Sequence, residues 1–178
     1  IHMLTTTTPA GVLYDVDMRL RPSGNSGLLV SSLEAFADYQ RREAWVWEHQ
    51  ALVRARGVAG SPVLARRFEE IRRETLSSEP DMDTLKREVV AMREKMRQHL
   101  GSSQQSRSAG WFHLKQDPGG MVDIEFMNQF AVLAMAHKEK ALLTYTDNMR
   151  ILETLESSGH LPFEGAEQLR KAWLAYRD

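Results

Sequence analysis

The 178-residue sequence contains no cysteine, which excludes disulfide bonds, thiolate zinc sites and thiol nucleophiles. An excess of charge of one sign is also missing, because 23 basic and 24 acidic side chains leave a formal net charge of −1. Such a balance gives no general attraction to nucleic acid or to an anionic membrane. Any binding of phosphate therefore has to be local.

Long apolar runs are absent as well. No stretch approaches the roughly 20 apolar residues that a membrane-spanning helix needs, and residues 1–3 resemble a cloning remnant rather than the start of a secretion signal. We expect a cytoplasmic protein that binds neither nucleic acid nor a membrane. The 42% of hydrophobic residues is enough for a chain of this length to bury a core.

Alternating charges mark the segment after residue 14. Asp15, Asp17, Arg19 and Arg21 occupy every second position, with apolar residues between them. Because alternate side chains of a strand share one face, the pattern predicts a strand whose charged face suits phosphate and metal. The alternative is the solvated face of an edge strand.

A turn and a second short apolar run follow. Residues 22–27 combine proline, serine, asparagine and glycine, which is typical of turns, and residues 28–30 are Leu-Leu-Val. The two runs predict a β-hairpin, although two strands alone are marginally stable in water.

From Ser32 onward, apolar residues recur at spacings of three and four, the period of helices. The pattern predicts one long helix of about six turns that ends at Gly57. Further helices are predicted over residues 61–76, 83–101, from about 122, 147–158 and from 162 to the end. The helix that begins near residue 122 is apolar over more than half of its circumference and is expected at the centre of a bundle. The expected fold class is mainly α (α+β), with an N-terminal β-hairpin before a helical bundle.

Some side chains have structural interpretations. Residues 102–110 are expected to form a mobile loop, because they are rich in serine and glutamine. Asp123 and Glu125 lie at a helix start, where carboxylates favour the positive end of the dipole. Glu48 is interpreted as a buried partner of Arg54 or Arg56. The helix over 83–101 carries basic side chains that we expect to be solvated: Lys86, Arg87, Arg93, Lys95 and Arg97.

Several longer motifs resemble one enzyme family. Residues 13–24 read Leu-Tyr-Asp-Val-Asp-Met-Arg-Leu-Arg-Pro-Ser-Gly, and residues 119–126 read Gly-Gly-Met-Val-Asp-Ile-Glu-Phe. With residues 35–56, 89–97 and 147–152, they resemble the bifunctional glutamine synthetase adenylyltransferase/adenylyl-removing enzymes over nearly the whole chain. Members of that family carry two nucleotidyltransferase domains of the DNA polymerase β type, each followed by a helical bundle.

The resemblance implies a domain organisation. Residues 43–49 look more like the C-terminal copy, which attaches AMP, than the N-terminal copy, which removes it; the adenylyl-removing half is the alternative. Residues 1–57 would be the C-terminal part of a nucleotidyltransferase domain and residues 58–178 a helical bundle. The chain would then be a fragment of a longer protein.

The implied reaction is the transfer of AMP from ATP to a tyrosine of glutamine synthetase, with release of pyrophosphate. In the superfamily, three carboxylates hold two Mg²⁺ ions at such sites. Asp17 matches the third carboxylate, and Asp15 is its neighbour. The sequence contains no Gly-Ser-x-Asp-x-Asp segment to supply the first two, so we expect this chain alone to be inactive.

Basic side chains are candidates for the nucleotide phosphates. Arg19 and Arg21 suit a triphosphate by charge and forked geometry, or pair with the nearby carboxylates instead. Lys115 and the turn at Gly119 and Gly120 could approach the nucleotide, since glycine lets backbone N–H groups come close to phosphate. A plain turn explains the same glycines.

A regulatory function remains open beside the catalytic one. The bundle could dock glutamine synthetase, a PII-type signal protein or the partner domain of its own chain, with glutamine as an effector. A nucleic-acid scaffold built on the basic helix is disfavoured by the balanced charge.

Overall fold

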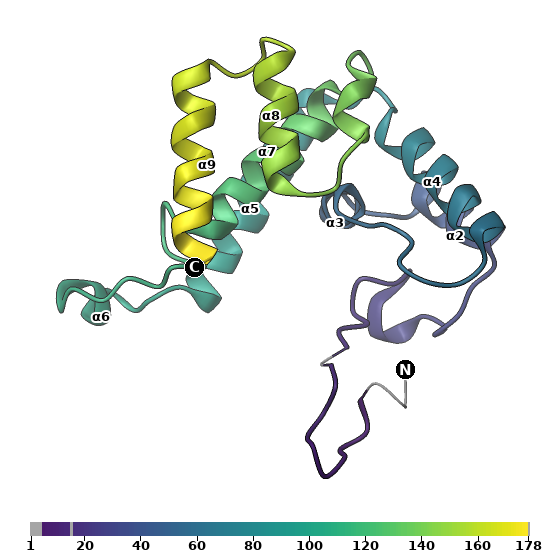
Figure 1. Ribbon diagram of the computed structural model, residues 1–178, viewed down its shortest axis with the longest axis horizontal. Helices are drawn as coiled ribbons and strands as arrows, with labels where there is room; N and C mark the ends of the chain where they lie inside the picture. Colours follow the sequence, from purple (N-terminus) through teal and green to yellow (C-terminus); the bar gives the residue numbers. More distant parts are fainter. Residues whose placement is uncertain (1–4, 15, 178) are drawn as a thin grey trace. The chain divides into compact units, whose positions relative to one another are not determined.

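The computed structural model describes residues 5–14 and 16–177 (Figure 1). The chain divides into two compact units, Ile1–Ala44 and Trp45–Asp178, which are described separately below. Helices dominate, and the described residues contain no β-strand apart from one isolated bridge between Thr8 and Gly11. The predicted helical bundle is confirmed, and the predicted β-hairpin is wrong. The functional boundary expected at residue 57 stays a prediction.

The first unit consists of a segment rich in turns and a helix. The turn predicted over residues 22–27 is present and includes the 3₁₀ helix η1 (Gly24–Ser26). The helix α2 (Leu33–Arg42) begins after Ser32, whose hydroxyl accepts a hydrogen bond from the N–H of Ala35 at 3.1 Å.

The two apolar runs of the expected hairpin lie in solvent. Leu28 is 80% exposed and Val30 is 82% exposed. In the first run Val12, Tyr14 and Leu20 are more than half exposed, and Val16 and Met18 are half-buried. Two paired strands would leave these side chains largely uncovered, so pairing would gain too little to offset the entropy of ordering the backbone. This explains why the alternating pattern does not produce strands here.

The long helix expected from Ser32 is interrupted, which is a second correction. Residues 43–45 separate α2 from α3 (Val46–Val53). A carboxylate oxygen of Glu48 accepts a hydrogen bond from the N–H of Trp45 at 2.9 Å and so caps a new helix. Glu48 is buried as expected, whereas Arg54 pairs with Glu125 of another helix.

The second unit is a bundle built around α7 (Met121–Met135), which contacts α3, α5, α8 and α9 (Figure 1). The predicted central position of this helix is confirmed. The remaining elements are α4 (Pro62–Leu76), α5 (Met82–Leu100), α6 (Gln104–Ser108), η2 (Lys140–Leu143), α8 (Asn148–Ser157) and α9 (Phe163–Arg177).

Most boundaries of these helices follow from local chemistry. Pro62 is at the first position of α4, and Asp81 and Asp147 cap α5 and α8 through backbone N–H groups of the first turn. The predicted mobile loop at residues 102–110 instead contains the short α6, whose cap Ser103 accepts a hydrogen bond from the N–H of Ser106 at 3.1 Å.

Arg72 is the largest fully buried side chain of this bundle. Its guanidinium donates hydrogen bonds to the carbonyl oxygens of Leu52 at 3.1 Å, Val53 at 2.7 Å and Leu143 at 3.1 Å. Burial lowers the pKa of Arg72, while Glu69 at 3.1 Å acts in the opposite direction. Arg72 therefore ties α4 to the end of α3 and to η2.

Candidate functional site

Asp17 is the first of the predicted site residues. Its two carboxylate oxygens accept hydrogen bonds from the guanidinium of Arg19 at 3.0 Å and 2.6 Å, and the Arg19 N–H donates to the same carboxylate at 2.9 Å. These hydrogen bonds lower the pKa of Asp17 to about 2. Both side chains remain more than half exposed. The structure therefore holds an ionised, accessible carboxylate beside a guanidinium.

Arg21 binds the backbone of its own turn. Its guanidinium donates to the carbonyl oxygen of Met18 at 2.6 Å, with longer contacts of 3.4 Å to the carbonyls of Asn25 and Gly27. Arg21 thus closes the turn that follows the charged segment. Asp15 lies outside the described residues.

The donor set for Mg²⁺ is incomplete in the part of the chain that the structure describes. Asp17 supplies one carboxylate, and both of its oxygens bind Arg19. Among residues 5–14 and 16–177, no three histidine, aspartate or glutamate side chains gather closely enough to hold a metal ion. These residues do not fit a complete two-metal site, so we derive no chemical step through Mg²⁺.

Lys115 lies in the second unit with an exposed side chain. It comes just before the glycine turn, whose N–H groups were candidates for phosphate. The Gly119 N–H donates to Asp123 at 2.6 Å, and the Gly120 N–H donates to the carbonyl of Asp117 at 2.9 Å. Because both donors are used inside the turn, the geometry favours the plain-turn interpretation of these glycines.

The conformation of this turn explains why both glycines are needed. Gly119 has a φ of +87°, which L-residues rarely adopt. A Cβ atom on Gly120 would lie 2.4 Å from the carbonyl oxygen of Leu114. The Gly119 carbonyl also accepts a hydrogen bond from the hydroxyl of Tyr176 at 2.9 Å, so the turn links α7 to α9.

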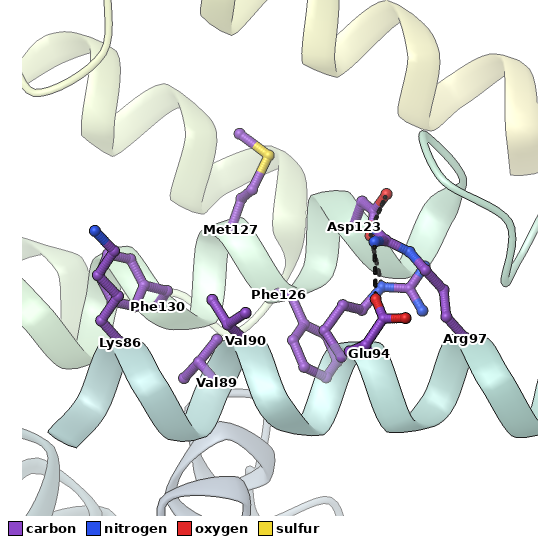
Figure 2. A pocket seen from close by; sticks show the side chains of 10 residues that line it. Lys86, Val89, Val90, Glu94, Arg97, Asp123, Phe126, Met127 and Phe130 are labelled. Atoms are coloured by element: carbon purple, nitrogen blue, oxygen red, sulfur yellow. Dashed lines mark hydrogen bonds and ion pairs between the residues drawn. The ribbon is translucent and has the colours of Figure 1, made fainter. Parts of the chain in front are cut away.

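A partly buried charge cluster joins α5 to the start of α7, as Figure 2 shows. Asp123 accepts hydrogen bonds from Arg93 at 2.5 Å and from Arg97 at 3.1 Å and 3.2 Å. Burial raises the pKa of Asp123, but the Gly119 N–H and the two guanidinium groups outweigh it, and the net shift is downward. Asp123 is therefore ionised in the folded protein.

This cluster corrects the expectation of a solvated basic face on α5. Arg93 is only 6% exposed, and its guanidinium also donates to the carbonyl oxygen of Gln116 at 2.8 Å. The sequence held a signal, because Arg93 follows Leu85 and Val89 at intervals of four residues. That spacing places Arg93 in the same buried stripe of the helix.

Asp117, a fully buried carboxylate, organises the segment before α7. It accepts hydrogen bonds from the N–H groups of Ser102 at 2.7 Å and His113 at 2.8 Å. The hydrogen bond from His113 contributes most to lowering the pKa of Asp117, which falls to about 2. No local sequence pattern indicates this anchoring role, because Ser102 lies 15 residues before Asp117.

Two protein-family models match this chain, one over its first part and one over its second. Residues 1–71 match the family model described as glutamate-ammonia ligase adenylyltransferase, and residues 87–178, just over half of the chain, match the model described as GlnD PII-uridylyltransferase. Each described helix is too short or too polar to traverse a lipid bilayer.

Curated relatives are similar over nearly the whole chain. Bifunctional glutamine synthetase adenylyltransferase/adenylyl-removing enzymes from Pseudomonas syringae and Pseudomonas aeruginosa are 57% and 53% identical over 99% of this chain. The protein of the same name from Vibrio parahaemolyticus is 51% identical over 100% of it. The chain spans 18–19% of the length of these relatives. It belongs to the family of bifunctional glutamine synthetase adenylyltransferase/adenylyl-removing enzymes, as its motifs predicted.

Proposed function

We propose that this chain is part of an enzyme that transfers AMP from ATP to a tyrosine of glutamine synthetase. The observation that carries the proposal is the surface carboxylate of Asp17, which lies in a motif shared with this family and is kept ionised by Arg19. Mg²⁺ is the metal that the family resemblance implies. Asp17 would be one of several carboxylates that such a site requires.

Arg19 has a second function in this proposal. Its side chain stays 76% exposed while it binds Asp17, so a triphosphate could reach it from solvent. A guanidinium binds phosphate oxygens in the same forked geometry that it uses for a carboxylate. Arg19 would therefore exchange part of its contact with Asp17 for the nucleotide. Arg21 donates a hydrogen bond to the carbonyl oxygen of Met18 in its own turn and would maintain the conformation of this loop.

The test is Asp17→Asn in a full-length enzyme that carries these residues. Incorporation of labelled AMP into glutamine synthetase should fall at least a hundredfold, because the loss of a transition-state ligand typically costs two orders of magnitude or more. Binding of glutamine synthetase should be unchanged. Asp38→Asn is the matched control, since Asp38 is an exposed carboxylate that pairs with Arg41 in the same unit. Unchanged transfer by the Asp17 variant would exclude this role.

The 178-residue chain alone is proposed to be inactive. It contains no Gly-Ser-x-Asp-x-Asp segment, and the described residues do not complete a metal site. Incubation of the chain with glutamine synthetase, labelled ATP and Mg²⁺ should give no labelled product. Labelling above the level of a sample without the chain would contradict the proposal.

A second candidate function concerns the helical unit. Residues 87–178 match a model named for PII-uridylyltransferase, so this unit could bind a PII-type signal protein. Pull-down with purified PII-type protein tests this directly. Binding by the chain should survive Asp17→Asn, because Asp17 belongs to the first unit.

A further inference from the structure

A groove runs between α5 and α7 in the second unit, and Figure 2 looks into it. One stripe of each helix lines it, and its volume is about 490 Å³. That volume falls in the range of about 300–1,000 Å³ that is usual for small-molecule sites. The groove lies within one unit, so its shape does not depend on how the two units are arranged.

The middle of the groove is apolar. Val89 forms part of its buried floor, and Phe126 and Phe130 are half-buried along it. Val90 of α5 and Met127 of α7 are 60% and 50% exposed, although both are apolar and line the groove. A continuous surface of this kind gains free energy when an apolar body displaces its water.

One end of the groove carries two arginines and two carboxylates. Two guanidinium groups, those of Arg93 and Arg97, share the single carboxylate of Asp123. Nη1 of Arg93 and Nε of Arg97 are buried and have no hydrogen-bond partner in the structure. Glu94 approaches Arg97 only at 3.5 Å and is itself half exposed. Buried donors without acceptors are unfavourable, so this end of the groove lacks two hydrogen-bond acceptors, which an anionic head group would supply.

We propose that the groove binds a small amphipathic anion: one carboxylate, sulfonate or similar singly charged head on an apolar body of about two fused rings. The head pairs with Arg97 and the edge of Arg93, which moves slightly to present its unpaired N–H. The body lies on Phe126 and between Val90 and Met127. Lys86 is at the far end of the lining, too distant along α5 to share the same head group, since 11 residues of helix span about 16 Å.

The unpaired guanidinium donors distinguish this ligand from a neutral apolar one. A neutral apolar molecule would fill the middle of the groove and leave the guanidinium donors unpaired. An anion of the same shape satisfies both requirements. Affinity should therefore depend on the head group as well as on the apolar body.

The test uses two fluorescent probes with similar bodies, 8-anilinonaphthalene-1-sulfonate, which carries one sulfonate, and the neutral N-phenyl-1-naphthylamine. Titration of the 178-residue chain should show sulfonate-probe binding that Met127→Glu weakens at least tenfold. Leu64→Glu is the matched control, because Leu64 is an apolar residue of α4 that is 58% exposed and outside the groove. Equal binding by both variants and the unmodified chain would overturn the proposal.

The head group is tested separately. Arg97→Gln should weaken binding of the sulfonate probe about tenfold and leave the neutral probe unchanged. Should this variant fail to fold by circular dichroism, the salt dependence of the unmodified chain decides. Raising NaCl from 50 to 300 mM should weaken only the sulfonate probe at the Met127-sensitive site. Equal behaviour of the two probes would exclude a role for the anion.

A third measurement distinguishes a ligand site from a covered surface. A full-length enzyme that carries these residues should retain the Met127-sensitive site for the sulfonate probe. Loss of that site in the longer protein would mean that another helix or segment fills the groove, and would overturn the proposal. Neither result depends on AMP transfer, so the proposed function is not at issue here.

Discussion

Residues 12–30 of the first unit and the helices of the second unit differ in where they keep their apolar and charged side chains. In the first segment, residues such as Leu28 and Val30 are exposed, and the Asp17–Arg19 pair lies in solvent. In the second unit, apolar residues are buried around α7, and the charges of Arg72, Arg93 and Asp117 are enclosed. The same residue types therefore contribute differently to folding stability in the two regions.

Burial accounts for this difference in weight. A charge pair in water is screened, and it gains little more than the entropy lost in holding two side chains together. A buried charge has given up its hydration, so each hydrogen bond to it has to be present. Changes to the buried charges of the second unit should therefore cost far more stability than equivalent changes near Asp17.

The largest effect is expected for Arg72→Met. The substitution removes the guanidinium and its hydrogen bonds to the carbonyl oxygens of Leu52, Val53 and Leu143. The free energy of unfolding in urea should fall by about 3 kcal/mol or more. Arg67→Met on the same helix removes an exposed pair with Glu70 and should cost about 0.5 kcal/mol or less. Similar losses in the two variants would show that burial is not the deciding factor.

Asp123→Asn should have the next largest effect. It leaves Arg93 and Arg97 without a full counter-charge and weakens the contact to Gly119, at a cost of about 2 kcal/mol in urea unfolding. Glu94→Gln is the local control, since Glu94 is exposed and 3.5 Å from Arg97. A smaller loss for Asp123→Asn than for Glu94→Gln would contradict the cluster's role.

A pH dependence should come from Asp117. Its pKa is about 2 in the folded chain and near 3.8 in a free side chain, so the folded state favours the ionised form. Its contribution to stability is complete above about pH 4 and disappears as the pH falls toward 2. In thermal unfolding near pH 5, Asp117→Asn should lower the midpoint temperature. The difference in midpoint temperature between this variant and the unmodified chain should become smaller as the pH falls toward 2. Glu88→Gln, on the exposed face of α5, should show no such narrowing.

The smallest effect on stability is expected for Asp17→Asn. The pair with Arg19 is exposed on both sides, and so is the backbone that it contacts. The urea midpoint of the 178-residue chain should not change measurably, even though AMP transfer by the full-length enzyme is expected to collapse. A large loss of stability would mean that Asp17 is a structural residue.

Much of the helical unit could be predicted from the sequence because local signals and the apolar period agree there. Pro62 and Asp81 mark helix starts, and the apolar surface of the helix after Gly120 predicts its central position. The hairpin failed because alternation describes a strand only when neighbouring strands cover it. Nothing within residues 12–30 can supply that cover.

Among the site residues, too, only contacts between residues close in the sequence could be predicted. Asp17 and Arg19 could be paired from their spacing, since neighbours two apart are close in most extended conformations. The cluster at Asp123 joins residues 30 and 26 positions away from it, and no local pattern gives such a distance. Even so, the place of Arg93 in the apolar stripe of its helix indicates burial, and a buried arginine requires a carboxylate or carbonyl partner.

Asp117 also determines where this protein tolerates extra residues. One carboxylate holds the N–H groups of Ser102 and His113, so the chain between them leaves and returns at a single point. Doubling the length of a flexible loop costs only about 0.6 kcal/mol, because its ends are already joined. An affinity sequence or a fluorophore inserted at the exposed residues 108–110 should therefore leave the contacts between the helices of the second unit intact.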